Sequence, residues 1–166
     1  MPANSSNSLD VAAAIVERIN PIGPAKLQKL VFYAAGEYAA LTGESLFPEN
    51  IEAWDYGPVV YSLWKTYKSF EADGDILESQ LGDVNKLNDL AKGCIASVVA
   101  KYGAFSGAKL IDMTHREPAW IESYMPGHGR TEIPLNVLVE SFRNRQATSA
   151  ISDELVDEFF AAQTRA

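Results

Sequence analysis

The sequence contains little cysteine, no long apolar run and few basic residues. Its single cysteine, Cys94, excludes a disulfide within the 166-residue chain. No apolar stretch approaches the roughly 18–20 residues that a membrane-spanning helix needs. The opening MPANSSNSLD has neither the basic flank nor the apolar core of a signal peptide. These absences predict a cytoplasmic protein that does not enter a membrane.

Acidic residues outnumber basic ones by 22 to 14, and the formal net charge is −8. This charge opposes approach to phosphate backbones and to anionic lipid. Neighbouring basic residues form only small pairs on patterns typical of the solvent-facing side of a helix, namely Lys26/Lys29, Lys65/Lys68 and Arg143/Arg145. The sequence therefore argues against nucleic acid as a partner, and a DNA-binding regulator is a minor alternative.

The composition is that of one globular domain. Hydrophobic residues make up 47% of the chain and charged residues 22%, which is ordinary for a folded domain. A chain of this length buries roughly 70% of the surface that it exposes when unfolded, so its core needs no covalent staple. Residues 1–7 are small and polar and are expected to be disordered.

Apolar periodicity predicts a mainly α-helical fold. A first helix is expected from a cap at Ser8 to a stop before Pro21. A second, from Pro24 to Gly43, is apolar over most of its circumference and is expected to be the buried central helix. Further helices are expected from Val84 to Tyr102, after a cap at Ser106, around Leu135–Phe142 and after a cap at Ser152.

Two of these helices carry residues with alternative interpretations. In the Val84–Tyr102 helix, Cys94 lies among inward-facing apolar residues, which favours a small buried hydrophobe over a reactive thiol. In the last helix, Phe159 and Phe160 form a narrow apolar edge. That edge either packs on the core or binds a groove on a partner.

Residues 45–56 predict a small β element. Alternation from Ile51 to Tyr56 is typical of a short strand, and Pro48-Glu49-Asn50 is typical of a turn, so a two-stranded hairpin is expected near residues 45–56. Gly57-Pro58 is then expected to begin a helix, with Pro58 at its first position. The predicted fold is a compact single-domain bundle of about six to seven helices around the central apolar helix, plus this hairpin.

The segment EAWDYGPVVYSLWKTYK, residues 52–68, concentrates the aromatic residues. Helical spacing favours core positions for Trp64 and Tyr67. Trp54 and Tyr56 fall on one face of the predicted strand, just before a tight turn. Large rings on a rigid edge are typical of protein-binding hot spots, although a core position remains the alternative for each ring.

The segment DMTHREPAW, residues 112–120, looks most like a catalytic site. A histidine beside carboxylates can perform acid–base chemistry or bind metal, and His115-Arg116-Glu117 matches the H-x-E start of the zinc deaminase motif. Those enzymes also need a downstream P-C-x-x-C, and no cysteine follows Cys94. His128 lies in a Pro-Gly-His-Gly loop with no helical register to His115. The sequence therefore predicts neither a metal site nor a cofactor.

The same segment has a structural interpretation. Thr114-x-x-Glu117 matches a capping box, with Trp120 and Ile121 directed inward, and an alternative register begins the helix at Pro118. The sequence favours capping and recognition over catalysis. A small hydrolase or transferase that uses His115 and Glu117 is the alternative.

Three segments, taken in order, resemble the Panacea domain of the SocA-like antitoxin family. They are KLQKLVFYAAGEYAALTGESLF, IEAWDYGPVVYSLWKTYK and LIDMTHREPAWIES. The resemblance covers about residues 24–125, and AWDYGPV and MTHREPAW are its most specific blocks. Met113 stands where the family usually has leucine. The resemblance implies an antitoxin domain over residues 8–125, with residues 126–166 as a helical extension packed on it.

This resemblance implies a non-enzymatic antitoxin of a two-gene toxin–antitoxin system. Such a protein binds and neutralises a cognate toxin, and the SocA type also delivers its toxin to the ClpXP protease as an adaptor, so ClpX is a candidate second partner. Carried onto this chain, the specific blocks imply partner-binding residues at Trp54, Tyr56, Gly57, Pro58, Tyr61, His115, Glu117 and Trp120.

Overall fold

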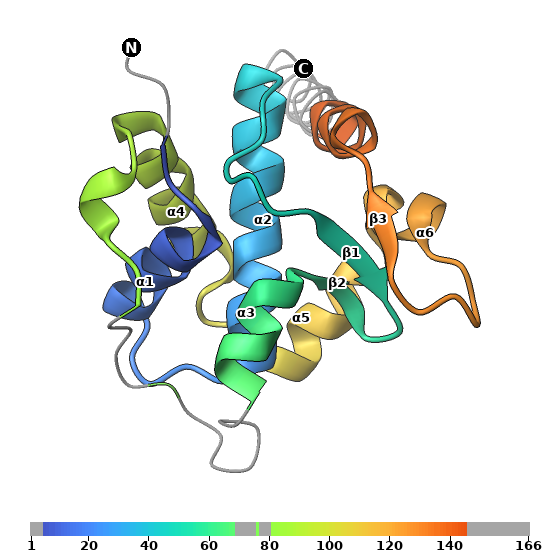
Figure 1. The fold of residues 1–166 in the computed structure, drawn as a ribbon, viewed down its shortest axis with the longest axis horizontal. Coiled ribbons are helices and arrows are strands. Elements are labelled where there is room, and N and C mark those ends of the chain that lie inside the picture. The colour runs from blue at the N-terminus through green and yellow to red at the C-terminus, as the bar shows by residue number, and fades with distance from the viewer. Residues whose placement is uncertain (1–4, 69–75, 77–80, 146–166) are drawn as a thin grey trace, which may run out of the picture.

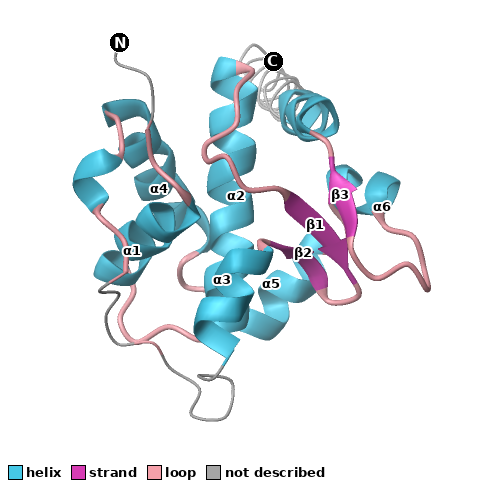
Figure 2. Ribbon diagram, viewed as in Figure 1, coloured by secondary structure: helices cyan, strands magenta, loops and turns pink. Residues whose placement is uncertain are grey.

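The computed structural model describes residues 5–68, 76 and 81–145 (Figure 1). Their α-helices are α1 (Ser8–Arg18), α2 (Pro24–Thr42), α3 (Tyr61–Tyr67), α4 (Asp89–Tyr102), α5 (Gly107–Thr114), α6 (Pro118–Ser123) and a helix at residues 135–145. A short 3-10 turn, η2 (Val84–Lys86), precedes α4, and one small sheet contains β1 (Ile51–Trp54), β2 (Gly57–Val59) and β3 (Thr131–Ile133). The mainly α-helical prediction is confirmed (Figure 2).

Helix α2 is the centre of the fold, as its wide apolar surface predicts. It lies between α1 and α4 on one side and the sheet on the other (Figure 1). Pro24 occupies its first turn, and Gly43 ends it in the left-handed conformation at φ 74°. Tyr33 and Phe32 are buried in it, and both rings contact Phe142 of the 135–145 helix edge to face.

The start of α1 differs from the prediction. Asn7, not Ser8, is the cap: its side chain accepts from the amide of Asp10, and the Asp10 carboxylate accepts from the amide of Asn7. Ser8 is the first helical residue, and its hydroxyl donates to the carboxylate of Glu49. Ser6 is buried and donates to the carbonyl of Leu46. The expected disorder is therefore wrong for residues 6 and 7, because both form specific hydrogen bonds.

The hairpin also lies later in the chain than predicted. Strands β1 and β2 pair antiparallel, with Trp54 opposite Gly57, so the turn is Asp55-Tyr56 and not Pro48-Glu49-Asn50. Pro58 lies within β2 and does not begin a helix; α3 begins at Tyr61. An edge strand tolerates proline because the amide that proline lacks would face away from the ladder. The sheet order is β2-β1-β3.

The expected helix from Val84 to Tyr102 is interrupted. Asn88 caps α4 by accepting from the amide of Ala91, and only the 3-10 turn η2 lies before it. The inward-facing set of this segment is confirmed as buried: Leu87, Ala91, Cys94, Ile95 and Val98. Burial raises the pKa of the Cys94 thiol to about 11, which disfavours the thiolate. Ser106 caps α5 as predicted.

The chain beyond residue 125 contributes to the same core. Strand β3 pairs with β1, and Leu138 and Phe142 of the 135–145 helix are buried. Gly36 of α2 has no side chain where the Phe142 ring lies, so the two helices approach closely. The division at residue 125 stays a prediction, and the helix expected after Ser152 lies outside the described residues.

Among the described helices, none taken singly has the length and apolar character to cross a membrane; α4 and α5 together meet those criteria but are bent by 107° at their junction.

Candidate functional site

The two specific sequence blocks meet at the β1–β2 turn. The indole Nε1 of Trp120 donates to the carbonyl oxygen of Trp54 at 2.8 Å. Nε2 of His115 lies 2.8 Å from the carbonyl oxygen of Asp55, and the Tyr124 hydroxyl donates to the Asp55 carboxylate at 2.5 Å. Side chains from the α5–α6 segment therefore hold the turn at two main-chain carbonyl groups and at the Asp55 carboxylate.

The rings behind the turn also pack on one another. Trp120 and Tyr124 are stacked, with centroids 4.4 Å apart and planes inclined by 16°, and His115 meets Trp120 edge to face at 4.6 Å. Tyr56, at the tip of the turn, is 74% exposed. The result is an exposed aromatic side chain on a backbone held from behind, a pre-organised arrangement that suits protein recognition.

A second aromatic group flanks the turn. Trp54 contacts Tyr61 and Trp64 of α3, with ring centroids 6.3 and 5.5 Å away. The guanidinium of Arg130 lies 3.8 Å from the centroid of Tyr61 and donates to the Glu52 carboxylate at 2.8 Å. Trp54 and Tyr61 are half-buried, so they support the turn and still present part of each ring to solvent.

Gly57 and Pro58 are held from within the fold. Lys29 of α2 is only 2% exposed and donates to the carbonyl oxygen of Pro58 at 3.1 Å. A β-carbon at Gly57, where φ is +107°, would lie 2.7 Å from Oγ1 of Thr114 and 3.1 Å from Cε of Lys29. Only glycine fits this position without strain. The expected solvent-facing position of Lys29 is wrong because the Pro58 carbonyl provides a buried acceptor.

A cavity of about 800 Å³ opens beside the turn. Five described parts of the fold line it: the first turns of α2, the hairpin, α3, α5 and Gly129 between α6 and β3. Most lining side chains are apolar or aromatic, among them Leu27, Val59, Leu63, Trp64 and Ile111, and Lys29 forms part of the wall.

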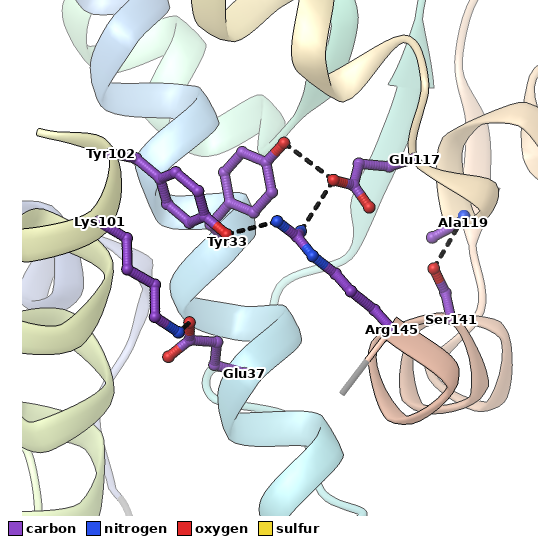
Figure 3. A network of polar contacts seen from close by, with 8 residues as sticks. All are labelled: Tyr33, Glu37, Lys101, Tyr102, Glu117, Ala119, Ser141 and Arg145. Atoms are coloured by element: carbon purple, nitrogen blue, oxygen red, sulfur yellow. Dashed lines mark hydrogen bonds and ion pairs between the residues drawn. The ribbon is translucent and has the colours of Figure 1, made fainter. Parts of the chain in front are cut away.

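Glu117 belongs to a different cluster, on the side of α2 that faces α4 and the 135–145 helix (Figure 3). Its carboxylate accepts from the Tyr33 hydroxyl at 3.0 Å and from Arg145 at 2.8 Å, while Arg145 also donates to the Tyr102 hydroxyl at 2.5 Å. Burial and the negative charge of Glu117 raise the pKa of Tyr33. Arg145, expected on the solvent-facing side of its helix, is half-buried in this network, which corrects that prediction.

The capping-box interpretation is also wrong. Thr114 lies in the last turn of α5 and donates to the carbonyl of Ile111, and the Glu117 side chain caps no amide. Helix α6 starts at Pro118, in agreement with the alternative register. Trp120 packs against the core, but Ile121 is 54% exposed and does not point inward.

The groups expected to form a catalytic site have separate partners. His115 contacts the Asp55 carbonyl, Glu117 pairs with Arg145, and Asp112 pairs with Arg116 on the surface at 3.1 Å. His115 therefore forms no hydrogen bond with the carboxylate of Asp112 or of Glu117. Within the described part of the chain, no three histidine, cysteine or carboxylate side chains gather in a way that could hold a metal ion.

The sequence analysis did not predict several residues of the site. Lys29 interrupts the apolar surface of a helix predicted to be buried, and Asp55 lies in an Asp-Tyr-Gly sequence typical of a turn, so both carried a usable signal. Tyr124, Arg130 and Arg145 carried none, because their partners lie at least 28 positions away in the chain.

Comparison with known families agrees with the resemblance seen in the sequence. The model of the family described as "Antitoxin SocA-like, Panacea domain" matches residues 27–121, which is 95 of the 166 residues. The match spans both blocks that meet at the β1–β2 turn. No curated protein and no solved structure matches the chain. By its sequence and by the extent of this match, the chain belongs to the SocA-like antitoxin family and carries a Panacea domain.

Proposed function

We propose that this protein is the antitoxin of a two-gene system and neutralises its cognate toxin by binding it directly in the cytoplasm. The observation that supports this proposal is the exposed ring of Tyr56, on a turn that His115 and Trp120 of the MTHREPAW block and the nearby Tyr124 hold in place. Rings that need not be ordered on binding contribute more of their contact energy to affinity. The proposed contact surface is centred on this ring.

The other predicted binding residues differ in this proposal: some contact the partner directly, and others support the surface from within the fold. Trp54, Tyr61, His115 and Trp120 are half-buried and border the turn, so each presents one edge to a partner and packs with the other. Gly57 and Pro58 are buried and set the path of β2. Glu117, which pairs with Arg145, acts at a distance by anchoring the start of α6.

A two-gene system predicts a small reading frame next to the gene of this protein, and the test uses the product of that frame. Co-expression should relieve the growth arrest caused by that product, and the two proteins should co-purify in near-equal amounts. Tyr56→Ala should weaken binding by about 2 kcal/mol, or about thirtyfold, since hot-spot rings cost this much on truncation. Leu41→Ala, at an exposed apolar side chain on α2, is the matched control and should leave affinity unchanged. Unimpaired binding by Tyr56→Ala would refute this surface, and absence of any complex would refute the function.

We further propose that the complex delivers the toxin to ClpXP, as the SocA type does. This step rests on family membership. With purified components, the toxin should be degraded by ClpXP only when the antitoxin is present, and the Tyr56→Ala variant should slow degradation in proportion to its lost affinity. A toxin that stays intact in the presence of both would leave sequestration as the mechanism.

This proposal assigns the protein neither an enzymatic role nor that of a DNA-binding regulator. His115 and Glu117, the pair that a hydrolase or transferase would use, have different partners. Four of the six paired basic residues donate hydrogen bonds within the fold and are therefore less available to a phosphate backbone, namely Lys26, Lys29, Arg143 and Arg145.

A further inference from the structure

The cavity beside the turn has the size and lining of a small-molecule site. Its volume of about 800 Å³ lies within the range of roughly 300–1,000 Å³ that is usual for ligand pockets. Leu27, Val59, Leu63 and Ile111 provide apolar walls from four different elements, and Trp64 adds an aromatic one. A compact apolar body would bury most of its surface there.

The charge of the cavity wall is opposite to that of the whole chain. Among the described residues that line it, Lys26, Lys29 and Lys68 face one carboxylate, Asp55, in a protein of net charge −8. The Asp55 carboxylate already accepts from the Tyr124 hydroxyl. A ligand that carries negative charge therefore fits this wall better than a neutral or cationic one.

None of these lysines has a carboxylate partner within the described residues. The four ion pairs found there use Lys101, Arg116, Arg130 and Arg145. Lys26 donates to the carbonyl of Gly103, and the ammonium of Lys68 lies 5.2 Å from the centroid of Trp64.

Lys29 is the least solvated of the three. Its ammonium meets one carbonyl, that of Pro58, and an ammonium carries three donors. Burying a charged group without a counter-ion is costly, and a bound carboxylate would offset that cost.

The first turn of α2 contributes a second positive element to the same wall. Residues 23–26 line the cavity, no side chain caps the helix, and its first turn has no acidic residue. The free amides at the start of this 19-residue helix carry partial positive charge. They lie on the same cavity wall as Lys29.

From the apolar walls, the positive lining and the buried lysine together, we infer that this cavity binds a small organic carboxylate with a compact apolar body. The carboxylate would pair with Lys29 and the start of α2, and the apolar body would lie against Val59, Leu63 and Trp64. The inference does not depend on the antitoxin function, because it rests only on described residues of this chain that line the cavity.

The test compares two probes that differ only in the charged group. Calorimetric titration of the full-length protein with 4-phenylbutyrate and with 4-phenylbutan-1-ol measures what the carboxylate adds. A charge-assisted hydrogen bond in a buried site predicts at least tenfold tighter binding of the carboxylate. Intermolecular nuclear Overhauser contacts from the phenyl protons to the methyl groups of Val59 and Leu63 should place the probe in the cavity.

Matched variants assign the preference to Lys29. Lys29→Met keeps an unbranched side chain and should lose most of the preference for the carboxylate probe, whereas Lys92→Met, at an exposed position of α4, should keep the full preference. Equal binding of both probes by the unaltered protein, or binding of neither, would overturn the inference whether or not Lys29→Met folds. Tighter binding of the peptide acetyl-Phe-Glu-Phe-amide in the same cavity would also overturn it, in favour of a polypeptide docking site.

Discussion

The indole of Trp120 donates its hydrogen bond to the main-chain carbonyl of Trp54, 66 positions earlier in the chain. This bond joins the two blocks by which the sequence resembles its family, and it ends at the last residue of β1, where the turn begins. The two blocks are therefore halves of one structural unit. In that unit α6 provides the support and the hairpin provides the exposed ring.

Replacing Trp120 by phenylalanine tests this unit. Trp120→Phe keeps an aromatic ring but removes the donor, and the half-buried carbonyl of Trp54 loses its partner. A lost partner of this kind costs about 1–2 kcal/mol. Urea unfolding should show that decrease in the free energy of unfolding. Trp64→Phe is the control, since the Trp64 indole nitrogen donates no hydrogen bond among the described residues, and it should cost less than half as much.

A pair of glycine substitutions tests the packing beneath the turn. Gly57→Ala places a methyl group against Thr114 and Lys29 at a residue with φ +107°, and it should destabilise the protein by about 2 kcal/mol or more. Gly93→Ala adds a methyl group in the middle of α4, with no described atom outside the local helix backbone within 4 Å, and should stabilise by about 0.5–1 kcal/mol. Thermal unfolding should move the two midpoints in opposite directions. A shift in the same direction would contradict the argument from packing at Gly57.

The sequence was sufficient to predict those helices whose limits and buried sides depend on nearby residues. The limits of α2 follow from Pro24 and Gly43, and the buried side of α4 follows from its apolar spacing, because both signals lie within a few residues. Family membership was also accessible, since blocks such as AWDYGPV are specific as strings of residues. From the sequence alone, function could therefore be predicted at the level of the family.

The sequence was insufficient to predict local structure where a residue pairs with a partner far away in the chain. Gly57-Pro58 has the sequence of a helix start, but these residues pair with β1 as a strand. The buried Lys29 side chain then donates a hydrogen bond to the Pro58 carbonyl. The Thr114–Glu117 spacing fits a capping box, but Tyr33 and Arg145 take the Glu117 carboxylate. In each case the competing partner lies far away in the chain, so no window around the residue could reveal it.

The Glu117–Arg145 pair should matter far more than a surface pair of the same charges. Glu117→Gln removes the charge that faces the half-buried Arg145 but keeps an amide oxygen that can accept from the Tyr33 hydroxyl, and it should cost about 2 kcal/mol in free energy of unfolding. Asp112→Asn breaks the exposed pair with Arg116 and should cost less than about 0.5 kcal/mol. Urea unfolding of the two variants makes the comparison. Equal losses would show that the network in Figure 3 has no special role in stability.

Lys29 should make the stability of the protein depend on alkaline pH. Burial lowers its pKa from 10.5 to about 8 in the folded protein, whereas the unfolded chain keeps the ordinary value. Between about pH 8 and 10.5 the unfolded state holds a proton that the folded state has released. Stability therefore rises with pH across this window, and the full cost of burying the charged lysine is present below pH 8.

The size of the effect follows from the shift in pKa. At about 1.4 kcal/mol per pKa unit, Lys29 should contribute a gain of roughly 3 kcal/mol between pH 8 and 10.5. Urea unfolding at intervals over this range measures it as the difference between the unaltered protein and Lys29→Met. The difference is needed because Tyr33 and Tyr102, whose pKa values are raised by burial, lower stability in the same alkaline range and cancel between the two proteins. A difference that stays constant with pH would mean that Lys29 is solvated as an exposed lysine is, which would also remove the buried charge from the cavity wall.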